Sequence, residues 1–492
     1  MRYLMYCIAA VMLVTGPRTW GEEIQIPYAP AQPDFTIPTA KGLHSVGVRA
    51  FAWINKSKTA LARSDSTDYR EIAVQVWYPA TVEDGDRSAL YFPELPAMLS
   101  AADGLPASEK RFVRAHAVLE NTATNSVPGA KILASARPWP VILFSPGGNV
   151  SRHAQTALAE RMAGLGFVFV SMSHPNSTID VTPRSGFSMS IDWGLDAEDA
   201  QAAAEADNAL AQVLAGDAKF VIDQLRTVHE IDPSFASALN LRHFGIFGLS
   251  RGGTTVGRAC ATISDIVACA VIDNIGPDRE RKTGIKQPFL TLRSPWDKER
   301  VAELHDYLQR TGSVAYDVEL FSSNHFSCTD MPLFMSDLRV EGIDPAAGID
   351  TCSEILAPFF DAYLRRQVSP SDSNWVRSVR SDAVKITKFQ ALLFDTGRAP
   401  WRPCRNRGAA LPAGQPAESP TSGTGGGFRS RFRFDFATHA PWRKASGREL
   451  FQHEPQLMLD ALQKSAVGSG LHLRLGINIG MVEPLRGKSC IA

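Results

Sequence analysis

Short apolar runs, many of them rich in β-branched residues, alternate with longer segments of helical periodicity between about residues 45 and 366. Most of these runs are continuous rather than alternating, which is typical of strands buried on both faces of a sheet. Because helical segments separate the strands, the pattern predicts βαβ units, a largely parallel sheet and the α/β class. The first two strands can pair as an antiparallel edge. The predicted strands are 46–53, 72–78, 140–144, 167–172, 244–247, 267–272, 289–292 and 318–321.

The helical segments include residues 151–163, and the last helix of the core is expected over 352–365. Residues 181–215 interrupt the alternation of strands and helices. Within this stretch, residues 196–213 are rich in alanine and acidic side chains and are predicted to be helical. We interpret the interruption as a helical cap insertion, about residues 181–230, near the functional site.

Beyond about residue 400 the composition changes to Pro, Gly, Ser and Arg, with a glycine-rich run at 423–427. Such a stretch cannot bury enough apolar surface to offset the entropy lost on ordering it. We therefore expect one α/β domain over residues 22–399, followed by a low-complexity, largely disordered tail over 400–492.

The N-terminus resembles an export signal. Arg2 precedes the apolar run 3–14, and the helix breakers Gly16 and Pro17 follow. The run is too short to span a bilayer, whereas its length and charge suit a secretory signal peptide, which we predict over residues 1–21. The expected location is secreted or periplasmic; the alternative is a short N-terminal helix of a cytosolic protein. No transmembrane span is expected elsewhere.

The charge balance excludes one class of partner. Lys+Arg and Asp+Glu each count 51, so the formal net charge is zero. Nucleic-acid binding usually requires a basic surface, so we expect no nucleic-acid partner. The hydrophobic fraction of 44% and the charged fraction of 21% are ordinary for a soluble enzyme.

Beyond the predicted signal peptide an even number of cysteines remains, which permits disulfides in an exported protein. We expect Cys328 to pair with Cys352, which would tie down the loop after the last predicted strand. Cys260 and Cys269 flank an apolar stretch and are either paired or buried free thiols. The cysteine spacings do not resemble a zinc site, and no metal or other cofactor is expected.

The strongest chemical signal is GLSRGG at residues 248–253, a G-x-S-x-G pattern. It follows the predicted strand 244–247 and precedes the helix-like segment 254–261, which is the strand–turn–helix context of the nucleophile elbow in α/β hydrolases. Glycines on either side let strand and helix close around a strained turn, which raises the serine hydroxyl to the sheet edge beside the positive end of a helix. We predict an α/β-hydrolase fold, with a mostly parallel central sheet flanked by helices and with Ser250 as the nucleophile.

A serine hydroxyl is a weak nucleophile, so it needs a base, and the base needs an orienting carboxylate. In this fold the partners follow the serine in the order acid, then histidine. His325 comes just after the strand 318–321 and is the predicted base, because a loop there would carry it over the sheet edge. His305 lies within a helical pattern and is interpreted as a surface residue.

Two residues can be the acid. Asp273 ends the strand 267–272, and Asp297 follows the strand 289–292. Both positions lie at the carboxyl ends of strands near the nucleophile, and spacing alone does not separate them. Asp278 and Asp330 are interpreted as surface charge or loop caps.

An acyl-transfer site also needs donors for the oxyanion. The backbone N–H of Arg251, directly after the nucleophile, is the first expected donor. The second is expected from the loop SPGGN at residues 145–149, with Gly148 as the donor, although an ordinary glycine-rich turn would have the same sequence. The Arg251 side chain either favours an acidic substrate or, as we prefer, pairs with a carboxylate of the cap.

These motifs resemble those of the platelet-activating factor acetylhydrolase family, with the dienelactone hydrolases as more distant relatives. The similarity covers roughly residues 45–366. The family's usual histidine in the oxyanion loop is replaced here by Pro146. Its triad acid ends the strand after the elbow, which implies Asp273 rather than Asp297. The resemblance is carried by residues 70–79, 143–148, Arg152, 248–253, Asp273, His325, Phe326 and Asp330.

The resemblance implies a secreted serine esterase without a cofactor, acting on small-molecule or lipid esters, with short-acyl phospholipids among the substrates and transient contact with a membrane surface. His174 and Phe326 are expected to line the substrate pocket, with a structural role favoured over a catalytic one for His174. The alternatives are a peptidase or amidase on the same fold and a non-catalytic binding protein of this fold.

Overall fold

In the computed structural model, the structure describes residues 21–39, 42–56, 69–191, 193–230, 232–367, 369, 374–379 and 382–390. The predicted signal peptide, apart from Gly21, and the predicted tail over 400–492 lie outside the described residues. Cys404 and Cys490 lie outside them too.

A mixed β-sheet forms the centre of the described part of the chain. Its central strands, from β9 to β15, are parallel, and antiparallel strands flank them on both sides. This confirms the predicted fold class. The strand order is β1 (Gly21–Ile24), β3 (Ser45–Asn55), β4 (Arg70–Thr81), β9 (Val168–Met172), β8 (Trp139–Ser145), β12 (Leu239–Leu249), β13 (Ile266–Ile272), β14 (Phe289–Arg293), β15 (Val314–Leu320) and β16 (Val384–Gln390).

Every predicted apolar run overlaps one of these strands, with bounds that differ by one residue at Phe167 and Phe321, and the first two strands pair antiparallel as expected. The sequence pattern missed the two outermost strands, β1 and β16. In β16 exposed and partly buried residues largely alternate, so it lacks the continuous apolar run that marks the inner strands.

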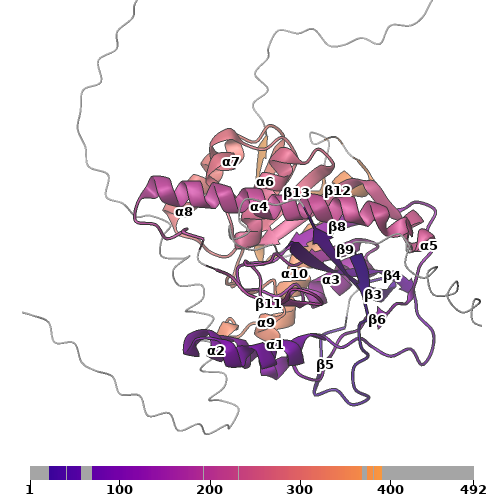
Figure 1. Cartoon of the computed structure of the whole chain (residues 1–492). Helices are drawn as coiled ribbons and strands as arrows, with labels where there is room; N and C mark the ends of the chain where they lie inside the picture. Colours follow the sequence, from indigo (N-terminus) through magenta and orange to yellow (C-terminus); the bar gives the residue numbers. More distant parts are fainter. Residues whose placement is uncertain are drawn as a thin grey trace, which may run out of the picture. The chain divides into compact units, whose positions relative to one another are not determined.

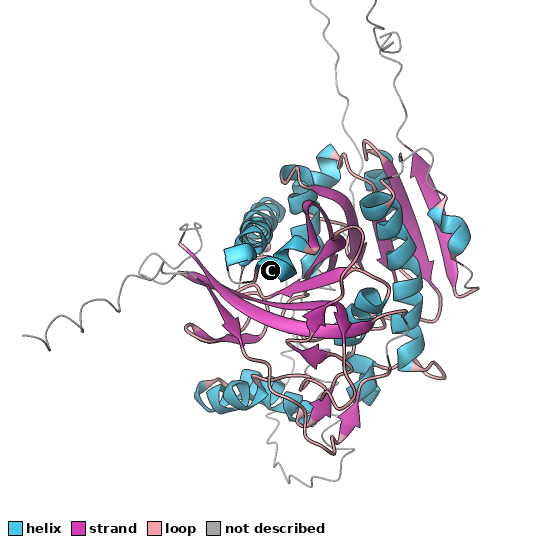
Figure 2. Cartoon of the chain, turned by 90° about the vertical axis from the view of Figure 1, so that its right-hand side faces the viewer, coloured by secondary structure: helices cyan, strands magenta, loops and turns pink. Residues whose placement is uncertain are grey.

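Two hydrophobic cores, one on each face of the sheet, hold the helices in place. Neighbouring residues of one strand serve opposite cores: Ile246 faces the layer with α4, α6 and α8, and Phe247 faces the layer with α3 and α10. The two layers lie on opposite sides of the strands in Figure 1, and Figure 2 shows the twist of the sheet between them. These helices are α3 (Thr156–Gly164), α4 (Ala200–Thr227), α6 (Arg251–Thr262), α8 (Lys298–Gln309) and α10 (Pro345–Phe360).

The predicted helical cap over 181–230 is not what the structure shows. The segment begins with a small hairpin, β10 (Asp180–Thr182) and β11 (Gly186–Ser188), and continues into α4. The second half of α4 packs on the sheet through apolar side chains such as Val221 and Leu225. The sequence-based interpretation was wrong because the alanine-rich, acidic first half hid the apolar stripe that appears after residue 210.

Shorter elements complete the described chain. In Figure 1, α1, α2 and α9 lie together below the sheet. The predicted helix 352–365 is the second half of α10 followed by a π-helical turn, Asp361–Arg365. The remaining elements are α1 (Leu95–Ala101), α2 (Ala107–Arg114), α5 (Pro233–Ser237), α7 (Asp278–Thr283), α9 (Met331–Phe334), β2 (Phe35–Thr36), β5 (Thr122–Ala123), β6 (Val127–Pro128) and β7 (Lys131–Ile132).

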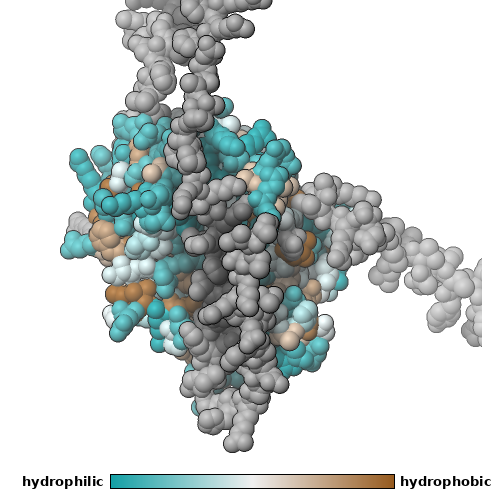
Figure 3. All heavy atoms as spheres, turned by 90° about the vertical axis from the view of Figure 1, so that its left-hand side faces the viewer, coloured by the Kyte–Doolittle hydropathy of each residue, from teal (hydrophilic) through white to brown (hydrophobic). Residues whose placement is uncertain are grey.

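On the face in Figure 3, hydrophilic side chains predominate and the hydrophobic areas between them are small and separate. Among the described residues, no helix has the length and apolar character needed to cross a membrane.

Among the described residues, two disulfides cross-link the elements of the fold. Cys328 pairs with Cys352, as predicted, and joins the loop after β15 to α10. Cys260 pairs with Cys269 and joins α6 to β13, which decides between the two alternatives left open for these thiols.

Removing the Cys328–Cys352 bridge should destabilise the protein more than removing the other bridge. The two bridges span 24 and 9 residues, and a longer closed loop loses more entropy in the unfolded state. We expect the Cys328→Ala/Cys352→Ala double variant to lose about 3 kcal/mol of unfolding free energy, measured by urea denaturation. The Cys260→Ala/Cys269→Ala variant is the matched control, and a larger loss in the control would contradict the expectation.

Candidate active site

The turn between β12 and α6 holds Ser250 in a strained conformation. Its φ of 52° and ψ of −122° are unfavourable for a residue with a side chain, and such strain concentrates at functional sites. Glycines make the turn possible. A Cβ on Gly248 would lie 2.3 Å from the Gly252 carbonyl oxygen, and a Cβ on Gly252 would lie 1.9 Å from the Ser145 carbonyl oxygen. Both glycines therefore let the strand and the helix close around the turn, as predicted.

Asp273 lies at the end of the neighbouring strand. The Ser250 N–H donates to the carbonyl of Ile272 at 2.9 Å, so Ser250 and Asp273 occupy adjacent strand ends. Asp273 also has a positive φ, 50°. Its carboxylate accepts hydrogen bonds from the Ser294 N–H at 2.7 Å and from Trp296 Nε1 at 3.0 Å. These two partners were not predicted from the sequence; Ser294 and Trp296 are the first and third residues after β14.

His325 joins Asp273 from the loop after β15. Its Nδ1 lies 3.3 Å from Asp273 Oδ2, and its side chain is 20% exposed. Burial alone would raise the pKa of Asp273, but the hydrogen bond and charge of His325, together with the Ser294 hydrogen bonds, lower that pKa below its ordinary value. The structure thus brings together two of the predicted residues beside the strained Ser250.

The other residues considered for these roles have other partners. Asp297 is the N-cap of α8, where its carboxylate accepts the Arg300 N–H at 2.7 Å. His305 is half-buried rather than a free surface residue, and its Nε2 lies 2.8 Å from Asp317. Of the two candidate acids, the structure therefore places Asp273 against His325.

The loop after β8 approaches the elbow closely. A tight turn runs from Gly147 to Val150, whose N–H donates to the Gly147 carbonyl at 3.2 Å. A Cβ on Gly147 would lie 3.4 Å from the Cβ of Ser250, and a Cβ on Gly148 would lie 2.7 Å from the guanidinium carbon of Arg251. A side chain at residue 148 would displace the Arg251 side chain, and glycine avoids this clash.

The Arg251 side chain reaches across this loop. Its Nη1 donates to Ser190 Oγ at 2.6 Å, and the Ser190 N–H donates to Asn149 Oδ1 at 2.7 Å. Arg251 thus bridges the helix after the nucleophile and the segment after β11 through the Ser190 hydroxyl.

His174, expected to line the substrate pocket, has its side chain enclosed by the described residues. It is fully buried, and its Nε2 and Nδ1 lie 2.9 Å from Ser145 Oγ and 3.0 Å from Asp217 Oδ2. Phe326 is also buried, with 9% exposure. Its ring packs edge-on against the His325 ring, with 5.1 Å between the ring centroids. Both positions follow strand ends, where sequence alone cannot separate an inward from an outward side chain.

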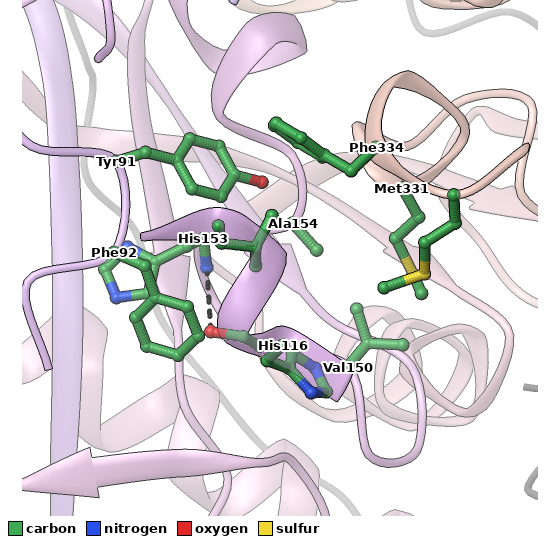
Figure 4. A pocket seen from close by; sticks show the side chains of 11 residues that line it. Tyr91, Phe92, His116, Val150, His153, Ala154, Met331 and Phe334 are labelled. Carbon is green, nitrogen blue, oxygen red and sulfur yellow. Dashed lines mark hydrogen bonds between the residues drawn. The ribbon is translucent and has the colours of Figure 1, made fainter. Parts of the chain in front are cut away.

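Two cavities lie near these loops. The first, of about 30 Å³, has room for only a few water molecules at about 10–15 Å³ each. Figure 4 shows it between Tyr91, Val150, Met331 and Phe334. The second, of about 350 Å³, lies between the loop after β15 and α10. Neither has Ser250 or His325 among its lining residues. In the described part of the chain, no group of three His, Cys, Asp or Glu is placed to hold a metal ion.

Asp330 was predicted to be surface charge or a loop cap, but it is fully buried. Its carboxyl accepts hydrogen bonds from the Ala157 N–H and from the Tyr91 hydroxyl, both at 3.1 Å. Burial raises the pKa of Asp330 to about 8, because these hydrogen bonds offset only part of the loss of hydration.

Comparison with known proteins gives one family match and one structural match that bear on the fold. Residues 29–183 match the family model described as platelet-activating factor acetylhydrolase, isoform II, which confirms the predicted resemblance for that part of the chain. The match includes β3, β4, β8 and β9 and ends before the elbow. No curated protein sequence matches the chain.

A ferulic acid esterase from Streptomyces cinnamoneus has a similar structure, with a TM-score of 0.57 and 20% sequence identity. The similarity covers 72% of this chain and 99% of the esterase. At this level of identity the likeness concerns the fold.

Asp330 should make stability fall as the pH rises. Between its ordinary pKa of about 4 and its raised pKa of about 8, the folded protein keeps a proton that the unfolded chain releases, so the stabilisation is complete below about pH 4 and lost through about pH 8. The Asp330→Asn variant should lack this decline in urea denaturation across the range. Asp84→Asn, at an exposed position, is the control. Parallel pH profiles of wild type and Asp330→Asn would refute the assignment.

Proposed function

We propose that the protein is a serine esterase that hydrolyses carboxylic esters through an acyl-enzyme, with Ser250 as the nucleophile, His325 as the base and Asp273 as the acid. The family match and the esterase-like fold support a carboxylic ester hydrolase. The observation that carries the proposal is the contact of His325 with Asp273 at 3.3 Å, on the strand end adjacent to the strained Ser250.

In the proposed mechanism, His325 accepts the hydroxyl proton while Ser250 Oγ attacks the ester carbonyl carbon. Asp273 stabilises the imidazolium that forms. The tetrahedral intermediate then expels the alcohol, which takes the proton from His325. A water molecule, deprotonated by His325, attacks the acyl-enzyme, and as the bond to Ser250 Oγ breaks His325 returns the proton to that oxygen, which releases the carboxylic acid and free Ser250.

The oxyanion is held by the backbone N–H groups of Gly148 and Arg251. Arg251 is the first residue of α6, where backbone N–H groups have no partner within the helix and the helix dipole favours negative charge. The close approach of the loop at Gly147 and Gly148 to Ser250 and Arg251 supports a second donor from that loop.

We further propose that the substrates are small or lipid esters, with short-acyl phospholipids as the first class to test, and that the protein is exported to the periplasm or the medium. The name of the matching family supports the lipid substrate. The apolar run at residues 3–14 supports export, as do the two disulfides, which persist in oxidising compartments.

Substitutions at the site test the proposal. Ser250→Ala should abolish hydrolysis of p-nitrophenyl acetate, because no nucleophile remains. Asp273→Asn should lower kcat by about 10³- to 10⁴-fold, because the imidazole loses its orienting carboxylate. Asp297→Asn is the matched control and should leave kcat unchanged, because asparagine caps a helix about as well as aspartate.

Labelling with a fluorophosphonate probe provides an independent measurement. Wild type and Asp297→Asn should be labelled at Ser250, and Ser250→Ala should not. If Asp297→Asn lost activity while Asp273→Asn kept it, the assignment of the acid would be wrong; a wild-type protein without esterase activity or labelling would refute the proposed function.

A further inference from the structure

A second serine, histidine and aspartate are hydrogen-bonded in line behind the oxyanion loop. Ser145 Oγ lies 2.9 Å from His174 Nε2, and His174 Nδ1 lies 3.0 Å from Asp217 Oδ2. All three residues are fully buried. A buried hydroxyl cannot meet a substrate, so this line of residues is not a second catalytic site.

The line continues at both ends. Beyond Asp217, the Arg70 guanidinium donates to the carboxylate through Nε at 2.9 Å and Nη2 at 2.5 Å. Beyond Ser145, its hydroxyl donates to Thr255 Oγ1 at 2.9 Å. This line of hydrogen-bonded side chains thus connects β4, α4, the segment after β9, the end of β8 and α6.

One end of this line of residues is a buried ion pair. Asp217 is an anion with two charged or polar partners in a fully buried position, and losing either partner would leave a buried charge uncompensated. Burial would raise the pKa of Asp217, but the charge of Arg70 and the hydrogen bonds of His174 and Arg70 lower it overall. The ion pair therefore fixes one end of this line of hydrogen-bonded side chains to β4 and α4.

The other end lies at the proposed oxyanion site. Ser145 is the last residue of β8 and directly precedes the loop with Gly148, while Thr255 lies in the helix that begins with Arg251. The Ser145 carbonyl also packs so closely on Gly252 that a Cβ there would lie 1.9 Å away. Ser145 thus contacts α6 through both its backbone and its side chain.

We propose that Ser145, His174 and Thr255 are positioning residues that fix the spacing of the oxyanion donors at Gly148 and Arg251, with the Arg70–Asp217 ion pair as their anchor. The inference rests on the proposed function. It predicts that breaking this line of hydrogen bonds weakens binding of the tetrahedral intermediate rather than binding of the substrate, because the donors meet the oxyanion only as charge develops.

The test compares Thr255→Val, which keeps the shape and removes the hydroxyl, with Thr255→Ser, which keeps the hydroxyl. With p-nitrophenyl acetate, Thr255→Val should lower kcat by about 10- to 100-fold, as expected for misplaced catalytic groups, with KM little changed. The affinity for phenylboronic acid, a tetrahedral analogue, should fall in parallel. Thr255→Ser should behave as wild type, and Ser145→Ala should reproduce the effect of Thr255→Val.

Thr291→Val is the matched control, because Thr291 is a buried threonine of β14 whose hydroxyl has no partner among the described residues; its kinetics should not change. If wild type is active and Thr255→Val and Ser145→Ala keep wild-type kcat and boronate affinity, this inference fails and the proposed function stands. Equal losses in Thr255→Val and Thr255→Ser, or a loss confined to KM, would also overturn it. A wild-type protein without esterase activity would overturn both.

Discussion

The candidate site depends on one local constraint, the left-handed backbone of Ser250 at the junction of β12 and α6. The strain is sustained because strand and helix close to contact distance around it, with Gly248 against Gly252 and Gly252 against Ser145. A residue with a side chain at either glycine would push the helix away from the sheet. The conformation that presents the serine is thus maintained by packing that involves β8 as well as the turn itself.

At the ends of the neighbouring strands, too, contacts from adjacent segments hold the site residues in place. Asp273 ends β13 with a positive φ, and Ser294 and Trp296, after β14, hold its carboxylate. His325 reaches Asp273 from the loop after β15, and the disulfide at Cys328 ties that loop to α10. Because parallel strands end at one edge of the sheet, side chains far apart in sequence meet there.

Buried ion pairs lie near the loop that we propose to hold the oxyanion. Arg70 and Asp217 lie behind it, and Arg152, a few residues after it, pairs with Glu94 and Asp180. Ion pairs in a low-dielectric interior contribute little net stability, but breaking one is costly. Their value here is geometric, because they hold segments near a glycine-rich loop that has few side chains of its own to pack.

The sequence by itself determined the inner strands of the sheet and the elbow, because continuous apolar runs and a G-x-S-x-G turn after a strand are local signals. It also favoured the Cys328–Cys352 pair, which only the tertiary structure confirmed, because the pairing joins distant elements. It left Asp273 and Asp297 equal on spacing, and the tertiary structure separated them, since one faces His325 and the other caps α8. It misjudged the cap, His174 and Asp330, whose placement depends on burial against distant elements. Which way a side chain faces at a strand end, and which helix covers it, is decided by packing that no local pattern encodes.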